Sequence, residues 1–350
     1  MLVDSPPEPS APPVPAAAPR ERRIPRAAGL LISLGVLLLV CGASIAIGAK
    51  SVPLGDVWHG LVHDSGTGND VIVVDVRLPR TVLGLLVGTA LGLAGAVMQA
   101  LTRNPLAEPG LLGVNAGAAA AVVSAISFLN VTSITGYVWF AFLGAAVVSA
   151  LVYVLGGTRG ATPVRLALAG TAATAALFGY VNAVQLLDSA ALDRLRFWTV
   201  GSLASADMST VGKVWPFVAI GVVLALLIAR PLNAMAMGDD TARALGARPA
   251  RTRVLAMVSV TLLCGAATAA CGPIVFVGLM VPHLVRAVTG PDMRWILPYA
   301  AVLSPVLLLG ADVVGRVIAR PSELQVGIVT ALLGGPVFVQ LVRGKRMGRL

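Results

Sequence analysis

The chain has 350 residues, a mean hydropathy of +0.88 and only 12% charged residues, and these values exclude a soluble globular domain. A formal net charge of +10 is also typical of nucleic-acid-binding proteins. The basic residues, however, stand in short segments between apolar runs, so membrane orientation accounts for them and no nucleic-acid partner is expected. The composition predicts an all-α polytopic membrane protein.

The N-terminal segment 1–28 is rich in Pro and Ala and ends in a cluster of arginines, so we expect a disordered cytoplasmic tail with a basic anchor. The apolar run at 29–49 is too long for a signal-peptide core and has no cleavage pattern at its end, which predicts a retained first membrane helix. Residues 50–76 are polar and are expected outside the bilayer.

A second span is predicted over 81–101, where no residue is charged. Gly84, Gly88 and Gly92 recur every four residues and therefore lie on one side of a helix. A glycine stripe lets helix backbones approach closely within a membrane. We therefore expect a central helix that packs against several neighbours.

Further apolar runs have ranges 111–129, 137–155, 164–187, 211–229, 252–271, 274–290, 296–313 and 325–342. With the first two, they predict ten transmembrane helices in one domain over 29–342, followed by a basic cytoplasmic C-terminus at 343–350. Ten spans place both termini on the same side. If that side is the cytoplasm, 18 of the 26 Lys and Arg residues lie inside, as the positive-inside rule requires.

The ionisable residues argue against several function classes. No Asp or Glu falls in the middle of a predicted span, whereas proton- or sodium-driven carriers usually need such groups or broken helices at the midplane. Cys41, Cys264 and Cys271 lie in apolar runs and are expected to be inert. The three histidines are too scattered for a metal site. The sequence offers no recognisable pair of nucleophile and base, so no enzyme activity is expected.

The loop at about 231–251 joins the sixth and seventh spans. Asp239 and Asp240 follow Gly238 and begin a short helical pattern, in which Ala242 and Leu245 form one face. Gly246 ends the pattern. The loop is either an ordinary basic loop or a short amphipathic helix on which a soluble partner docks.

Seven segments, in order and with regular spacing, carry a family resemblance. They are RLPR at 77–80, AGAVMQALTRNPLAEPGLLG at 94–113, LAG at 168–170, W-x-x-GSL at 198–203, GDDTARALG at 238–246, GPIVFVGLMVPHLVR at 272–286 and VGIVTALLGGPVF at 326–338. Together they resemble the transmembrane permease subunits of ABC importers for iron chelates (siderophores and haem) and cobalamin, over about residues 30–342.

The resemblance implies a permease in the cytoplasmic (inner or plasma) membrane that forms a dimer with a second copy or with a paralogue. It also implies two ATP-binding subunits and an extracytoplasmic substrate-binding protein. The chain has no Walker A sequence, so we expect it to bind no cofactor, with ATP and Mg on the partner subunits. A ferric siderophore is the first choice of substrate. Haem and cobalamin are alternatives, and a secondary carrier is the competing class.

The resemblance also assigns site residues. Those expected to couple the permease to the ATPase are Gly238, Asp239, Asp240, Ala242, Arg243, Leu245 and Gly246. Those expected to dock the binding protein are Arg77, Arg80 and Arg316, for which snorkelling to lipid headgroups is the alternative. Those expected at the cytoplasmic gate are Asn104, Pro105, Leu106 and Thr162. Gln99 is expected either to face the path or to bond a neighbouring helix.

Overall fold

The computed structural model describes residues 25–343 except 64–65, 67, 132 and 157–162, so residues 1–24 of the expected tail, the C-terminal residues 344–350 and Thr162 lie outside the described residues. The expected disordered tail 1–28 is wrong at its end, because α1 already begins at Arg26. Within the described part the chain is helical and contains no strand. The helices are α1 (Arg26–Ala46), α2 (Leu54–His63), α3 (Asn69–Val71), η1 (Ile72–Arg77), α4 (Leu78–Thr102), η2 (Pro109–Leu112), α5 (Val114–Leu129), α6 (Ile134–Leu155), α7 (Pro163–Leu187), α8 (Ser189–Trp198), α9 (Met208–Leu227), α10 (Ala229–Ala236), α11 (Asp239–Ala244), α12 (Pro249–Cys271), α13 (Val277–Thr289), α14 (Met293–Ile318) and α15 (Val326–Arg343).

Each of the ten predicted apolar ranges corresponds to a helix. Seven helices in the described residues are long and apolar enough to cross a membrane, while α5, α13 and α15 are shorter apolar helices. The protein is therefore a multi-pass membrane protein.

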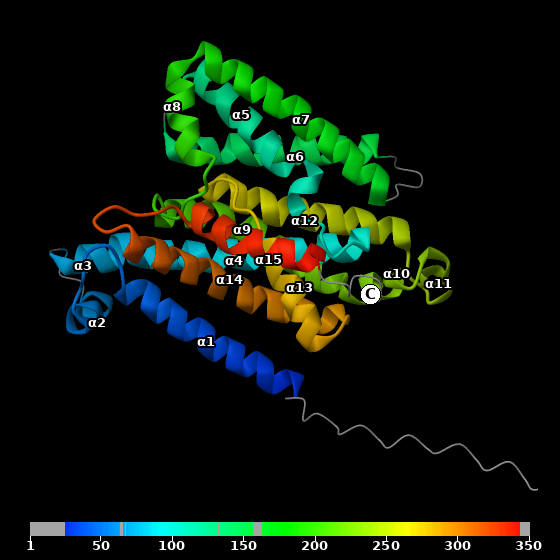
Figure 1. The fold of residues 1–350 in the computed structure, drawn as a ribbon, viewed down its shortest axis with the longest axis horizontal. Helices are drawn as coiled ribbons and strands as arrows, with labels where there is room; N and C mark the ends of the chain where they lie inside the picture. The colour runs from blue at the N-terminus through cyan, green and yellow to red at the C-terminus, as the bar shows by residue number, and fades with distance from the viewer. Residues whose placement is uncertain (1–24, 64–65, 67, 132, 157–162, 344–350) are drawn as a thin grey trace, which may run out of the picture.

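The helices run side by side in layers (Figure 1). Helices α5, α6, α7 and α8 form one side of the bundle, α4 and α12 lie at its centre, and α1 lies at the opposite edge. The short helices α10 and α11 lie at one end, and α2 and α3 lie at the other (Figure 1). Helix α1 begins, and α15 ends, toward the end that carries α10 and α11.

The central helix is longer than predicted. Helices α3, η1 and α4 form one continuous run, Asn69–Thr102, so the last residues of the polar segment 50–76 extend the helix of the second predicted span. The helix continues because Val73 is completely buried and Arg77 is bonded to neighbouring backbone. Apolar composition alone does not reveal those contacts.

Glycine allows α4 to pack closely against its neighbours. A Cβ placed on Gly88 would lie 2.5 Å from the Cα atom of Pro305, and one on Gly84 would lie 2.4 Å from the Leu309 side chain; both partners belong to α14. Gly92 faces α14 in the same way. Gly95 contacts α13 instead, where an added Cβ would lie 1.8 Å from the carbonyl oxygen of Gly278. The glycine side of α4 is thus filled by α14 and α13.

Helices α12 and α13 are separate, with a non-helical break at 272–276. Gly272 has φ +74°, and an added Cβ there would lie 2.0 Å from the carbonyl oxygen of Trp198, so only glycine fits. Phe276 adopts the left-handed region with φ +69°, which is rare for an aromatic residue. Because of this break, α13 begins inside the bundle.

Candidate coupling site and buried charge network

The loop between α9 and α12 folds into α10 and the short helix α11. Gly238 (φ +105°) precedes α11 and Gly246 (φ +80°) follows it, so glycines at both boundaries supply the left-handed backbone. The predicted start at Asp239 and stop at Gly246 agree with the helix bounds Asp239–Ala244.

Asp239 joins α11 to two long helices. Its carboxylate accepts a hydrogen bond of 2.8 Å from Arg103, which directly follows α4, and another from Arg253 of α12. Partial burial acts to raise the pKa of Asp239, but the bonds and charges of Arg253 and Arg103 outweigh it and leave that pKa below its ordinary value. The charged carboxylate therefore links α11 to Arg103, just after α4, and to Arg253 of α12.

The two apolar residues expected to share a face of α11 lie in different surroundings. Ala242 is completely buried, whereas the Leu245 side chain is exposed. The expected common face is therefore wrong: Ala242 fixes α11 to the bundle, and Leu245 projects from it. Asp240 and Arg243 pair with each other on the exposed side. The exposed side of α11 therefore carries the apolar side chain of Leu245 and the Asp240–Arg243 pair.

Three of the expected gate residues, Asn104, Pro105 and Leu106, lie on the loop after α4. Arg103 has φ +50°, and the Asn104 side chain accepts a hydrogen bond of 3.0 Å from the backbone N–H of Leu106. Pro105 stands between them, so this turn is locally fixed. The same turn carries Arg103, the partner of Asp239, and therefore any movement of α11 acts on it directly.

Two polar side chains hold the start of α13. Glu108 accepts a hydrogen bond of 3.2 Å from the backbone N–H of Phe276, which would otherwise be unpaired. Gln99 donates a hydrogen bond of 3.0 Å to the carbonyl oxygen of Leu279 and is 1% exposed. Of the two alternatives for Gln99, the bond to a neighbouring helix is the one found. A place for Gln99 on the path stays a prediction.

A buried charge network lies at the other end of α4. Asp312 of α14 is fully buried, and its carboxylate forms ion pairs with two guanidinium groups. The nitrogen–oxygen distances are 2.7 Å to Arg80 and 3.0 Å to Arg316. Arg80 also pairs with Glu323 at 2.6 Å, and Arg316 donates to the carbonyl oxygen of Ser44 in α1. The network joins α1, α4, α14 and the segment before α15.

Arg77 is buried through backbone contacts. Its guanidinium group donates hydrogen bonds of 2.8 Å to the carbonyl oxygens of Ile45 and Ala46, just where α1 ends. It also donates to the carbonyl oxygen of Lys50. These bonds satisfy carbonyl groups that the end of α1 leaves without helical partners. Arg77 therefore caps α1 and fixes it beside α4.

The three arginines expected to dock the binding protein are buried in this structure. Arg77 and Arg80 are each 4% exposed and Arg316 is 2% exposed, because Asp312, Glu323 and backbone carbonyl groups occupy their donors. They do not snorkel to lipid either. A direct docking role for them stays a prediction and requires these internal bonds to open.

Sequence reasoning missed Asp312 and Glu108. Asp312 falls at the end of the apolar range 296–313, but α14 continues to Ile318, so the carboxylate lies within a helix. Its spacing of four residues from Arg316 was a readable signal for a helical ion pair. Glu108 gave no such signal, because its partner is a backbone N–H distant in sequence.

The described part of the chain is a helical membrane bundle with a short helix, α11, in the loop between α9 and α12. The chain belongs to the FecCD transport family, whose model matches residues 36–344. That family match covers every helix described above except the first residues of α1.

Named relatives agree with this assignment. The chain is 47% identical over 315 residues to the ferric enterobactin transport system permease protein FepD of Escherichia coli K12, covering 89% of this chain and 94% of the relative. It is 41% identical to the iron(3+)-hydroxamate import system permease protein FhuB of Bacillus subtilis (90% and 83%) and 36% identical to the hemin transport system permease protein HmuU of Yersinia pestis (90% and 95%).

A solved structure has the same fold. It is described as an inward-facing conformation of a putative metal-chelate type ABC transporter, with a TM-score of 0.79 and 27% identity. The match covers 91% of this chain and 99% of that chain.

Proposed function

We propose that this protein is the permease subunit of an ATP-driven importer that carries an iron chelate, with a ferric siderophore as the substrate, across the cytoplasmic membrane. The observation that carries the proposal is α11, held by Asp239 between Arg103 and Arg253 with Leu245 exposed. Such a helix transmits the closure of a partner to α4 and α12 as a rigid lever. The names of the relatives support an iron chelate as cargo.

In this proposal ten helices cross the membrane, both termini face the cytoplasm, and two permeases form a dimer around the path. Two separate ATP-binding subunits hydrolyse ATP with Mg, and an extracytoplasmic binding protein delivers the substrate. The position of α11 on the same end of the bundle as the start of α1 and the end of α15 supports the common side of the termini (Figure 1).

Reconstituted transport tests the proposal. The chain is placed in liposomes with its ATP-binding subunits and binding protein, and uptake of radioactive ferric siderophore, haem and cobalamin is compared. ATP-dependent uptake of the siderophore is expected. Uptake by this chain alone under a proton or sodium gradient would instead establish a secondary carrier, and preference for haem or cobalamin would reassign the substrate.

A further inference from the structure

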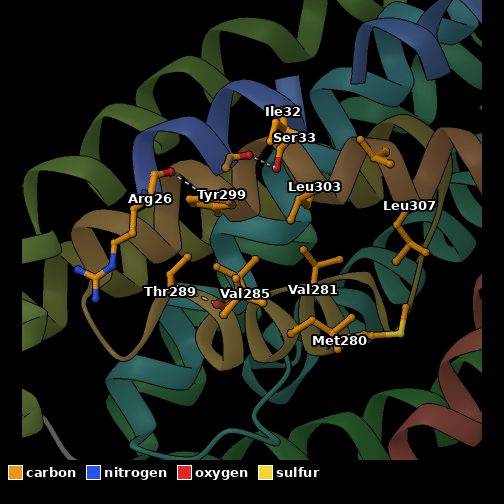
Figure 2. Close-up of a pocket in the computed structure, with 14 residues that line it drawn as sticks. Arg26, Ile32, Ser33, Met280, Val281, Val285, Thr289, Tyr299, Leu303 and Leu307 are labelled. Carbon is orange, nitrogen blue, oxygen red and sulfur yellow. Dashed lines mark hydrogen bonds between the residues drawn. The ribbon is translucent and has the colours of Figure 1, made fainter. Parts of the chain in front are cut away.

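A groove lies on the outer surface between α1, α13 and α14 (Figure 2). It has a volume of about 480 Å³, within the range of small-molecule sites. Its walls are mainly aliphatic, and the residues that line its length are Ile32, Met280, Val281, Leu284, Leu303 and Leu307. Leu284 and Val288 on its rim are 51% and 78% exposed, so the groove opens toward the lipid that surrounds the bundle.

One end of the groove is cationic. Arg26, the first residue of α1, lines this end, and its backbone carbonyl oxygen accepts a hydrogen bond of 2.6 Å from the hydroxyl of Tyr299 (Figure 2). A Cβ added to Gly290 would lie 3.6 Å from the Arg26 guanidinium group, which therefore reaches the turn between α13 and α14. Among the described residues, no hydrogen bond or ion pair of this guanidinium group is found.

The charged end lies near the membrane boundary. Asp292, in the same α13–α14 turn, accepts a hydrogen bond of 2.6 Å from Asn233 of α10, so the turn belongs to the end of the bundle that carries α10 and α11. An apolar slot in the membrane surface that ends in an arginine at the headgroup level matches one ligand chemistry: an acyl chain joined to a phosphate. A planar guanidinium group can grip two phosphate oxygens at once.

We propose that this groove binds one anionic phospholipid, with an acyl chain between α1 and α13 and the headgroup phosphate on Arg26. An apolar helix in this groove would fit less well, because it would cover Arg26 without a counter-charge. Helix α1 packs mainly on α14, so the lipid fills the space that separates α1 from α13. The bound lipid should therefore stabilise α1 in its place.

Native mass spectrometry of the full chain tests this site. Wild-type protein in detergent is titrated with phosphatidylglycerol or with phosphatidylcholine of the same acyl chains, and retained lipid is counted. Selective retention of phosphatidylglycerol is expected. Arg26→Gln should weaken that retention about fivefold, the typical effect of one basic residue on an anionic lipid. Arg251→Gln is the matched control, because Arg251 is exposed at the start of α12 and lies outside the groove.

A second variant separates the apolar part from the charge. Leu284→Trp fills the groove from its exposed rim, so it should lower retention of both lipids while the protein keeps its elution volume. Equal retention by wild type, Arg26→Gln and Leu284→Trp would overturn the proposal. Disulfide formation between two copies that carry Leu284→Cys would also overturn it, because a second chain would then cover the groove.

Discussion

Arg103 and Asp239 are 136 residues apart in sequence, and the 2.8 Å hydrogen bond between them joins the end of the central helix to the proposed coupling helix. Helix α4 has 25 residues, so a displacement at Arg103 can be carried about 37 Å to the opposite end of the bundle. At that end Arg80 enters the buried network around Asp312. One rigid helix thus connects the two ends at which partners are expected.

Breaking the Arg103–Asp239 bond should uncouple ATP hydrolysis from transport. Asp239→Asn is expected to lower uptake at least several-fold with little change in protein stability, because the pair is partly exposed and such pairs contribute little to folding. Uptake and ATPase activity are measured in liposomes. Asp193→Asn is the control, since Asp193 forms an exposed pair with Arg196 in α8, outside the proposed coupling helix. Equal uptake by both variants would contradict the lever role.

Removing one member of the buried network should destabilise the fold. Arg80→Gln leaves the Asp312 carboxylate buried with only part of its compensating charge, at a cost of about 3–5 kcal/mol. The expected result is a large fall in the thermal unfolding temperature in detergent. Glu323→Gln, at the partly exposed rim of the network, should have a much smaller effect.

Charge-neutral variants of the three buried arginines test the docking prediction. If Arg77, Arg80 or Arg316 contacts the binding protein directly, its charge-neutral variant should fold normally and lose binding-protein affinity. If the arginines are structural, affinity should fall only together with stability. Affinity is measured by surface plasmon resonance on protein reconstituted in nanodiscs.

Close packing between α4 and α14 makes Gly88 sensitive to any side chain. Gly88→Val is expected to destabilise the protein by about 1–3 kcal/mol or more, because its Cβ would meet backbone atoms of Pro305 that cannot move aside. Gly310→Val on α14 serves as the control, since no atom lies within 4 Å of an added Cβ there. Similar unfolding temperatures for the two variants would contradict the observed packing.

Asp292 should make stability pH-dependent in acid. The side-chain hydrogen bond of Arg294, with further bonds from the backbone and Asn233, lowers the pKa of Asp292 from 3.8 to about 2. A folded-state pKa below the unfolded one stabilises the protein above the unfolded value, and this contribution is lost as pH falls from about 4 toward 2. In Asp292→Asn the loss of stability between pH 5 and pH 3 should be smaller than in wild type, as followed by thermal unfolding.

The hydropathy of the chain, which is a local property, determined where the helices lie in the sequence. Each predicted apolar range coincides with a helix, and Gly238, Asp239 and Gly246 located α11, because glycine boundaries and helix starts depend on neighbouring residues. The glycine spacing in α4 likewise identified a close-packed side. The family resemblance rested on the same local segments.

Only the tertiary structure decided which charges are free. Arg80 and Asp312 are 232 residues apart, and nothing local in the sequence indicates that they pair. Gln99 and Glu108 likewise bond the start of α13, which is distant in sequence. Residue type and spacing set the local backbone, but the partner of a buried polar group depends on which helices pack together, and that choice is made by the whole bundle.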